Sequence, residues 1–256
     1  AWKVMRYGPS DVRLMERLAD APTKAERLRL LDDDSDLIGP DFIKLVLEQG
    51  NNEAKGGQFD RASRLQDVAQ EIATGLGDAA SLGRCFSYRG MSLDDQGRYE
   101  PALGSYQQAL RLFRGAGDRA AEASVLGNIG TVYGSMGRYK ESLKNHQDAL
   151  QIERDLGDRG GEALMLNNIA AVYCDTGRYA EALQYYQDAL KIRRDLGDRA
   201  GEAKTLCDTG TLYLNTSRYK EALQQFQDVL PILRDLGDRR GEGDALDAVS
   251  YTHLRA

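Results

Sequence analysis

The sequence predicts an all-α protein, a right-handed superhelical solenoid in which pairs of helices are stacked one after another. Three observations lead to this fold class. The chain repeats itself with a period of forty residues over most of its length. Each period contains two short glycine-containing stretches that divide it into two segments. Within each segment the apolar residues recur at the spacing of one helix face, which is typical of stacked helix pairs.

Two sets of residues mark the period. A Gly-Asp pair returns every forty residues, at Gly77-Asp78, Gly117-Asp118, Gly157-Asp158, Gly197-Asp198 and Gly237-Asp238. A second marker lies twenty residues away from the first, at Gly57, Gly97, Gly137, Gly177 and Ser217. These two breaks leave two segments of roughly sixteen residues in each period, and segments of that length suit helices of four to five turns.

Both segments of a period are predicted to be amphipathic helices. In one second segment the apolar positions follow the spacing i, i+3, i+4, i+7, i+10 and i+11, and they are Tyr179, Ala182, Leu183, Tyr186, Ala189 and Leu190. The first segment before it follows the same rule with Ala163, Leu166, Ile169, Ala170 and Tyr173. Gln, Lys, Arg, Asp and Asn fill most other positions, so each helix has one apolar face for packing.

The turn residues predict how each helix ends and the next one begins. Gly157 is expected just beyond a helix, with a positive φ that a side chain would oppose. Asp158 is expected to cap the following helix, and Glu162 adds negative charge to its first turn. Ser217 breaks the glycine rule, so a slightly strained or a re-formed turn is expected there. Pro231 lies where a helix should continue, so a kink is expected.

A single helix pair would leave much of its apolar surface in water. Stacking the next pair covers that surface, so each copy shields its neighbour. Small residues at matching sites are expected to let the helices approach closely, and they are Ala102, Gly130, Ala170, Ala182 and Ala222.

Both ends of the chain depart from the regular repeats. Residues 11–36 are expected to form short helices, with a capping box from Thr23 to Glu26. Residues 249–256 fall out of register, and we expect them to be a foreign tail; a divergent capping helix is the alternative. The expected domains are a prelude at 1–40, an array at 41–248 of five helix pairs and part of a sixth, and the tail at 249–256.

The repeated positions resemble the tetratricopeptide repeat, whose pattern is a Leu-Gly pair, Tyr, Gly, an aromatic residue, Ala, an aromatic residue and Ala. One copy reads Ile169-Ala170, Tyr173, Gly177, Tyr179, Ala182, Tyr186 and Ala189. Two others read Ile129-Gly130, Tyr133, Gly137, Tyr139, Ser142, His146, Ala149 and Thr209-Gly210, Tyr213, Ser217, Tyr219, Ala222, Phe226, Val229. The resemblance covers about residues 41–250. The forty-residue form is similar to the long-helix subgroup of G-protein-signalling modulators, kinesin light chains and bacterial signalling proteins.

Composition excludes several classes of function. The net charge is −6 and the basic residues alternate with acidic ones, which disfavours binding to nucleic acid or to an anionic membrane. No apolar run reaches the roughly 18 residues that span a bilayer, and no signal peptide is visible. Three widely spaced cysteines, Cys85, Cys174 and Cys207, predict neither a disulfide framework nor a zinc site. A reduced, cytoplasmic setting is therefore expected.

The sequence contains no pattern that predicts catalysis, a metal or a cofactor. Of the two histidines, His146 occupies the aromatic slot filled by Tyr186 and Phe226 in other copies, which favours a packed core residue. Motifs for a serine nucleophile, a phosphate-binding loop, a zinc protease or an EF-hand are missing from the sequence. The acidic run at 32–36 lacks the glycine and the distal glutamate of a calcium loop. We therefore expect no enzymatic activity.

The resemblance implies that the first helix of each pair lines a concave groove where partners bind. The candidate groove residues are Arg84, Tyr88, Asn128, Thr131, Asn167, Asn168, Asp175, Lys204, Asp208, Thr211 and Asn215. An asparagine amide donates and accepts at once and so matches a peptide backbone. The alternative, left open for Asn167 and Asn168, is that they satisfy polar groups between helices. Aspartates such as Asp175 and Asp208 favour a partner with basic side chains.

The expected function is an interaction scaffold that holds a protein or peptide in this groove. One alternative is the regulatory array of a larger bacterial signalling protein whose effector domain, for example a CHAT-type protease, lies outside this fragment. That alternative comes from the layout, in which short helices precede the array. An enzyme in its own right and self-assembly through the last repeat are two further alternatives.

Overall fold

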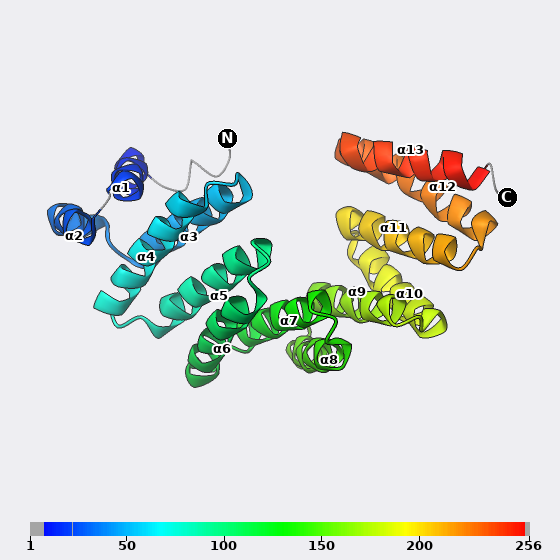
Figure 1. Ribbon diagram of the computed structural model, residues 1–256, viewed down its shortest axis with the longest axis horizontal. Coiled ribbons are helices and arrows are strands. Elements are labelled where there is room, and N and C mark those ends of the chain that lie inside the picture. Colours follow the sequence, from blue (N-terminus) through cyan, green and yellow to red (C-terminus); the bar gives the residue numbers. More distant parts are fainter. Residues whose placement is uncertain (1–7, 22, 254–256) are drawn as a thin grey trace. The chain divides into compact units, whose positions relative to one another are not determined.

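The computed structural model describes residues 8–21 and 23–253, and in that part of the chain all regular structure is helical (Figure 1). The helices are α1 (Pro9–Asp20), α2 (Lys24–Asp33), α3 (Pro40–Lys55), α4 (Phe59–Gly75), α5 (Ala79–Asp95), α6 (Tyr99–Ala116), α7 (Arg119–Ser135), α8 (Tyr139–Leu156), α9 (Arg159–Asp175), α10 (Tyr179–Leu196), α11 (Arg199–Asn215), α12 (Tyr219–Leu236) and α13 (Arg239–His253), with a 3-10 turn, η2, at Ser35–Leu37. The predicted all-α class is confirmed. None of the helices in the described ranges is long and apolar enough to cross a membrane.

The chain divides into two compact units, and the boundary lies inside α7 between Val132 and Tyr133. Unit 1 contains α1 to α6 and most of α7. Unit 2 contains the last residues of α7 and α8 to α13. Each unit is built from consecutive helices that pack in pairs, as the repeat pattern predicts.

In unit 1 the helices α5 and α6 form an antiparallel pair. Gly90 lies opposite the ring of Tyr106, and Gly83 lies opposite the ring of Phe113, so the register runs in opposite directions along the two helices. A Cβ atom at residue 90 would come within 2.6 Å of the Tyr106 ring. Glycine at this position therefore permits the close approach of the two helices, as the small residues of the pattern predict.

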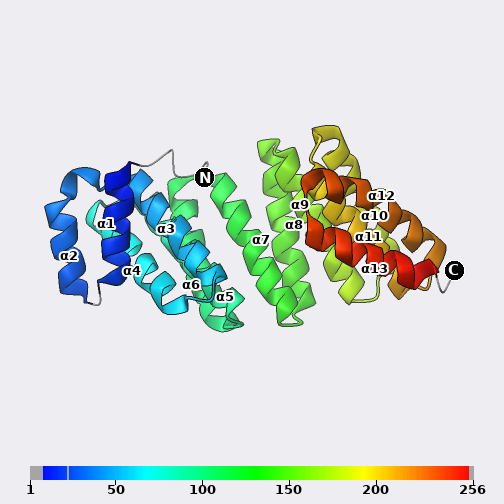
Figure 2. The same ribbon diagram turned by 90° about the horizontal axis from the view of Figure 1, so that it is seen from above.

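One core runs from the prelude into the first pairs of unit 1. Leu14 and Leu18 of α1 belong to the same buried cluster as Ile43 of α3, Val68 of α4 and Cys85 of α5. Helix α1 contacts α4, and Figure 2 shows it beside α3 and α4. The predicted prelude therefore shares the interior of the array and does not have a separate core. Thr23 and Glu26 form the predicted capping box at the start of α2.

In unit 2 the pairs α9–α10 and α11–α12 and the helix α13 follow one another in contact (Figure 1). A buried cluster with Leu206 of α11, Val229 of α12 and Ala245 of α13 joins successive pairs, with Leu190 of α10 packed against it. This shared interior is the predicted physical basis of the stack. Helix α12 continues through Pro231 as one element, so the proline does not end it.

Helix α13 also runs through most of the segment that the repeat pattern excludes. Val249 packs against the core of unit 2, and Thr252 is completely buried. The loss of register therefore does not interrupt the helix. The foreign origin of residues 249–256 stays a prediction.

The turn chemistry follows the predicted scheme. Gly157 has a φ of +71° and ends α8, and the Asp158 carboxylate accepts a hydrogen bond of 2.9 Å from the backbone N–H of Gly161. Equivalent glycines with positive φ are Gly77, Gly117, Gly197 and Gly237. Equivalent caps are Asp78, Asp118, Asp198 and Asp238.

A further interaction that the sequence analysis missed joins consecutive pairs at three of these turns. The Glu162 carboxylate is nearly buried and pairs with Arg154 of the preceding helix at 2.8 Å and with Arg159 of its own first turn. The same arrangement recurs with Arg114, Arg119 and Glu122, and with Arg194, Arg199 and Glu202. Burial acts to raise the pKa of Glu122, but hydrogen bonds from the two arginines outweigh it and lower the pKa. The repeated motif thus supplies an ion-paired link as well as a cap.

Ser217 has a φ of +59°. Within the described ranges it is the one residue other than glycine that has a positive φ. This confirms the strained turn that the sequence predicts. Replacing Ser217 by Gly should stabilise the chain by about 1 kcal/mol, because glycine has no Cβ to clash in the left-handed conformation. Urea denaturation followed by circular dichroism measures the change. The reverse change Gly177→Ser should lower stability by a similar amount, and a Ser217→Gly variant no more stable than the parent would contradict the assignment.

Candidate interaction surface

The first helix of each pair in unit 2 presents one line of exposed and half-buried side chains. The line consists of Leu164, Asn168, Ala171 and Asp175 on α9, of Lys204, Asp208, Thr211 and Asn215 on α11, and of Asp244, Ala248 and Tyr251 on α13. Spacings of four, three and four residues keep these positions on one face of each helix. Since α9 and α11 contact each other, their parts of the line lie side by side. We call these eleven residues the first-helix row.

Most of the predicted groove residues of unit 2 belong to this row. Asp175, Lys204, Thr211 and Asn215 are exposed, whereas Asn168 and Asp208 are half-buried. The Thr211 hydroxyl donates to the backbone oxygen of Cys207 at 3.0 Å, so it is already used within its own helix. The binding role of these residues stays a prediction, because no bound partner is present.

Asn167 does not face the groove, and this part of the prediction is wrong. Its side chain is only 2% exposed. The amide nitrogen Nδ2 donates to Asp208 Oδ2 at 2.9 Å, and the amide oxygen Oδ1 accepts from Thr205 Oγ1 at 3.0 Å. Asn167 therefore satisfies polar groups between α9 and α11, which was the alternative reading. The sequence contained a signal for this placement, because Asn167 stands one residue before Asn168, which belongs to the row.

In unit 1 the predicted residues lie on α5 and α7. Arg84 and Tyr88 of α5 are half-buried, and the Arg84 guanidinium donates to Ser81 Oγ at 3.0 Å. On α7, Asn128 is half-buried and Thr131 is exposed. Burial, followed by the charge of Glu48, raises the pKa of the Tyr88 hydroxyl.

Two carboxylates of the first-helix row lie close to the same pair of neutral groups in unit 2. Cys174 Sγ donates a weak hydrogen bond to the Tyr186 hydroxyl at 4.0 Å. Burial raises the pKa of the Cys174 thiol, and the charges of Asp175 and Asp208 act in the same direction. Burial raises the pKa of Asp175 itself. A partner group that brings positive charge to this place would offset these effects.

Acidic groups also surround a second thiol of unit 2, that of Cys207, which directly precedes Asp208 of the row. Burial, followed by the charges of Asp208, Asp238 and Asp244, raises the pKa of Cys207 to about 11. In the described part of the chain, Asp175, Asp208 and Asp244 form no ion pair, whereas the turn glutamates such as Glu162 are paired with arginines. The row therefore presents negative charge that no described residue neutralises by an ion pair.

Two exposed residues of α13 belong to the row although the sequence analysis left them out. Asp244 and Tyr251 stand forty residues after Lys204 and Thr211, and Tyr251 is 47% exposed. The forty-residue register was the signal that identifies both of them. The sequence analysis set Tyr251 aside because the pattern around it breaks down.

The imidazole of His146 and the thiol of Cys85 lie in the interior and outside the row. Burial lowers the pKa of His146 to about 4 and raises that of Cys85 to about 12, so both are neutral and enclosed near neutral pH. Within residues 8–21 and 23–253, no three side chains of His, Cys, Asp or Glu gather as a metal site would require.

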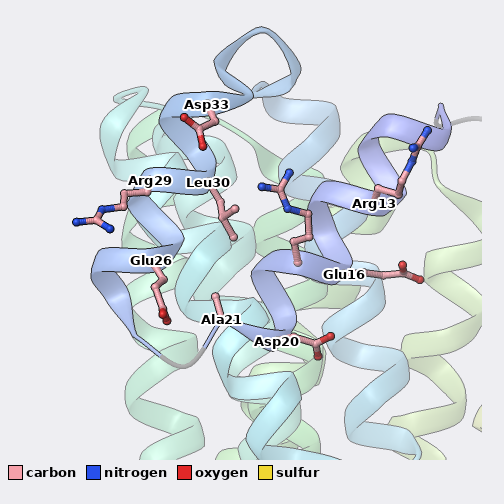
Figure 3. A pocket seen from close by; sticks show the side chains of 9 residues that line it. Arg13, Glu16, Asp20, Ala21, Glu26, Arg29, Leu30 and Asp33 are labelled. Atoms are coloured by element: carbon pink, nitrogen blue, oxygen red, sulfur yellow. The ribbon is translucent and has the colours of Figure 1, made fainter.

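A separate hollow of about 800 Å³ lies between α1 and α2 in unit 1. Figure 3 shows Leu30 of α2 and Ala21 at the end of α1 between side chains of both charges. The lining residues are Arg13, Glu16, Arg17, Asp20, Ala21, Glu26, Arg29, Leu30 and Asp33. Because three arginines alternate with four carboxylates, the hollow does not select a ligand of one charge.

Solved structures similar to this chain share its fold, whereas no curated protein matches its sequence. BtubC (BKLC) from P. vanneervenii is 20% identical with a TM-score of 0.72, and the match covers 89% of this chain and 90% of that one. A signal transduction ATPase with numerous domains, which has a tetratricopeptide repeat sensor and comes from Pyrococcus horikoshii, is 16% identical with a TM-score of 0.70; the match covers 90% of this chain and 36% of that one. A Rap protein complexed with Competence and Sporulation Factor is 14% identical with a TM-score of 0.62, over 90% of this chain and 69% of that one.

The family assignment follows from the sequence itself. A model of the tetratricopeptide repeat matches residues 95–155 and 161–235, which together make up more than half of the chain. The matched segments coincide with the most regular helix pairs of the fold, from the end of α5 to α12. The chain belongs to the tetratricopeptide repeat family.

Proposed function

We propose that this chain is an interaction module without catalysis of its own, which holds a protein or peptide segment along the first-helix row. Membership of the tetratricopeptide repeat family supports an interaction or sensor scaffold. The observation that carries the finer proposal is the row itself, where Asn168, Asp175 and Asp208 offer hydrogen bonds and unpaired charge on adjacent helices. A reiterated stack makes such an extended surface, which a single helix pair lacks.

The charge of the row predicts the chemistry of the partner. Asp175, Asp208 and Asp244 form no ion pair with the described residues, and Lys204 is the basic member of the row. A segment with Lys or Arg side chains would meet complementary charge at these positions. Binding should therefore weaken as the salt concentration rises.

The test is selection of random twelve-residue peptides on the immobilised chain, followed by fluorescence anisotropy of a selected peptide. The double variant Asn168→Ala and Asn215→Ala should lower its affinity by about tenfold or more, because each amide loses hydrogen bonds worth about 1 kcal/mol. Helicity and melting temperature should stay the same, since Asn168 is only half-buried and Asn215 is exposed.

The matched control replaces two exposed amides on second helices, Gln187→Ala and Gln227→Ala. It removes the same kind of side chain from outside the row, so peptide affinity should not change. Equal affinity in both double variants would show that the peptide binds elsewhere.

A second candidate is the sensor array of a larger signalling protein. The similar ATPase from Pyrococcus horikoshii favours it, because the match covers only 36% of that chain and that protein has a tetratricopeptide repeat sensor. Sequencing the locus on both sides of this segment tests the idea. A continuous reading frame that encodes an effector domain supports it, and stop codons at both ends would rule it out.

A further inference from the structure

A polar connection crosses the otherwise apolar contact between α9 and α11. Thr205 Oγ1 lies 3.0 Å from Asn167 Oδ1, and Asn167 Nδ2 lies 2.9 Å from Asp208 Oδ2. Thr205 is fully buried and Asn167 is 2% exposed, while Asp208 reaches the first-helix row. The three side chains thus connect the interior of unit 2 to its surface.

The repeat does not require these residue types at these positions. The position of Thr205 is occupied by Val125 and Met165 in the two preceding copies. The position of Asn167 is occupied by Gly127 in one neighbouring copy and by Cys207 in the other. Burying two polar side chains costs free energy that a pair of apolar residues would avoid. The connection is therefore special to this pair of helices and calls for a reason beyond packing.

The chemistry of the Asn167 amide determines which of its atoms faces Asp208 and which faces Thr205. An amide can turn so that either its oxygen or its nitrogen faces a given neighbour. An amide oxygen that faced the ionised carboxylate of Asp208 would be repelled, so the nitrogen of Asn167 faces it. The oxygen then points to the Thr205 hydroxyl, which also lies 3.0 Å from the backbone oxygen of Gly201.

The hydrogen bond from Asn167 restrains the carboxylate of Asp208. One of its carboxylate oxygens is held by Asn167, and the carboxylate forms no ion pair with the described residues. Its charge acts on Cys174 and Tyr186 together with that of Asp175, so both carboxylates lie near these two side chains. A carboxylate held at one oxygen keeps the other oxygen for a partner, and it loses less freedom when that partner binds.

We propose that Thr205 and Asn167 are positioning residues, which hold Asp208 so that it accepts a hydrogen bond from a cationic side chain of the bound segment. This inference rests on the proposed function of the first-helix row. It adds the group on the partner that Asp208 recognises and the buried residues that set the specificity.

The test uses two acetylated twelve-residue peptides, one of alternating alanine and lysine and one of alternating alanine and glutamine. Thr205→Val should lower the affinity for the lysine peptide by about fivefold, about 1 kcal/mol, and leave the glutamine peptide unchanged. Net charge is the same in both proteins, so general attraction between the acidic chain and the peptide does not change. Valine fits the site, since Val125 fills the equivalent position in another copy, and the melting temperature should fall by only a few degrees because the buried oxygen of Asn167 loses its donor.

Three variants make the result decisive. Thr209→Val removes another buried hydroxyl of α11, one that donates to the backbone oxygen of Thr205, and it should not alter the preference for lysine. Thr205→Ser should restore the preference. Asp208→Asn should abolish it, because the acceptor charge is gone.

The outcomes separate this inference from the proposed function. If Asp208→Asn loses the preference for lysine and Thr205→Val keeps it, the positioning role is overturned and the binding surface stands. If Thr205→Val loses affinity for both peptides together with thermal stability, its role is only structural. If Asp208→Asn binds both peptides as the parent does, the contact proposed for the row is wrong.

Discussion

The variant Gly90→Val is expected to lose about 3 kcal/mol of stability. A Cβ at this position would meet three atoms of the Tyr106 ring at 2.6 to 2.8 Å. The ring is 1% exposed and cannot move aside without opening the contact between α5 and α6. Overpacking of this kind typically costs about 1 to 3 kcal/mol, and the branched side chain of valine adds atoms where the ring already lies.

Gly104→Ala is the matched control for this prediction. Gly104 lies in the middle of α6, the partner helix of α5, and an added Cβ there would meet nothing within 4 Å. Alanine should therefore stabilise the helix by about 0.5 to 1 kcal/mol, since it restricts the unfolded chain. Urea denaturation of both variants measures the two changes. A Gly90→Val variant as stable as the parent would show that the two helices do not approach so closely.

The second large effect is a loss of stability in mild acid, caused by His146. This side chain is 2% exposed, its Nδ1 atom has no hydrogen-bond partner, and burial lowers its pKa to about 4. An unfolded chain has the ordinary histidine pKa of about 6.5. Between these two values the unfolded state binds a proton that the folded state does not bind. Stability should therefore be complete above about pH 6.5 and should fall as the pH drops toward 4.

The expected loss between pH 7 and pH 4.5 is about 2 to 3 kcal/mol, which follows from the separation of the two pKa values. His146→Phe removes the titrating group and retains a ring, as Phe226 does in the same slot of a later copy. Urea denaturation at the two pH values compares the variant with the parent. Carboxylates such as Glu122 titrate in both proteins, so only the difference between them reports on His146. Equal acid sensitivity would show that the histidine is not the cause.

Local features of this protein follow from the sequence because their causes are local. Gly157 and Asp158 end one helix and begin the next through backbone φ and a cap formed within three residues. The slot of His146 also follows from the sequence, because the spacing of apolar residues places it on the packed face of α8. The row that contains Asn168 and Asp175 has the same origin, since a helix face is set by residue spacing.

Residue type could not show that Asn167 is buried whereas Asn168 is only half-buried. They are adjacent and identical, and the sequence analysis assigned both to the groove. Asn167 is instead enclosed by Thr205 and Asp208, which lie 38 and 41 residues further along the chain. Likewise, the arginines that pair with Glu162 come from two different helices. Such contacts depend on the rotation of one helix against the next, which no local rule specifies.

The sequence by itself determined the repeat, the lengths and ends of its helices, and the faces that they bury. The forty-residue period and the chemistry of glycine, caps and apolar spacing suffice for these features. Only the tertiary structure decided which polar side chains are used between helices and which, such as Asp208, remain available at the surface. The physical reason is that the hydrogen bonds and ion pairs of a buried side chain depend on neighbours that packing brings close, whereas helix boundaries depend on neighbours along the chain.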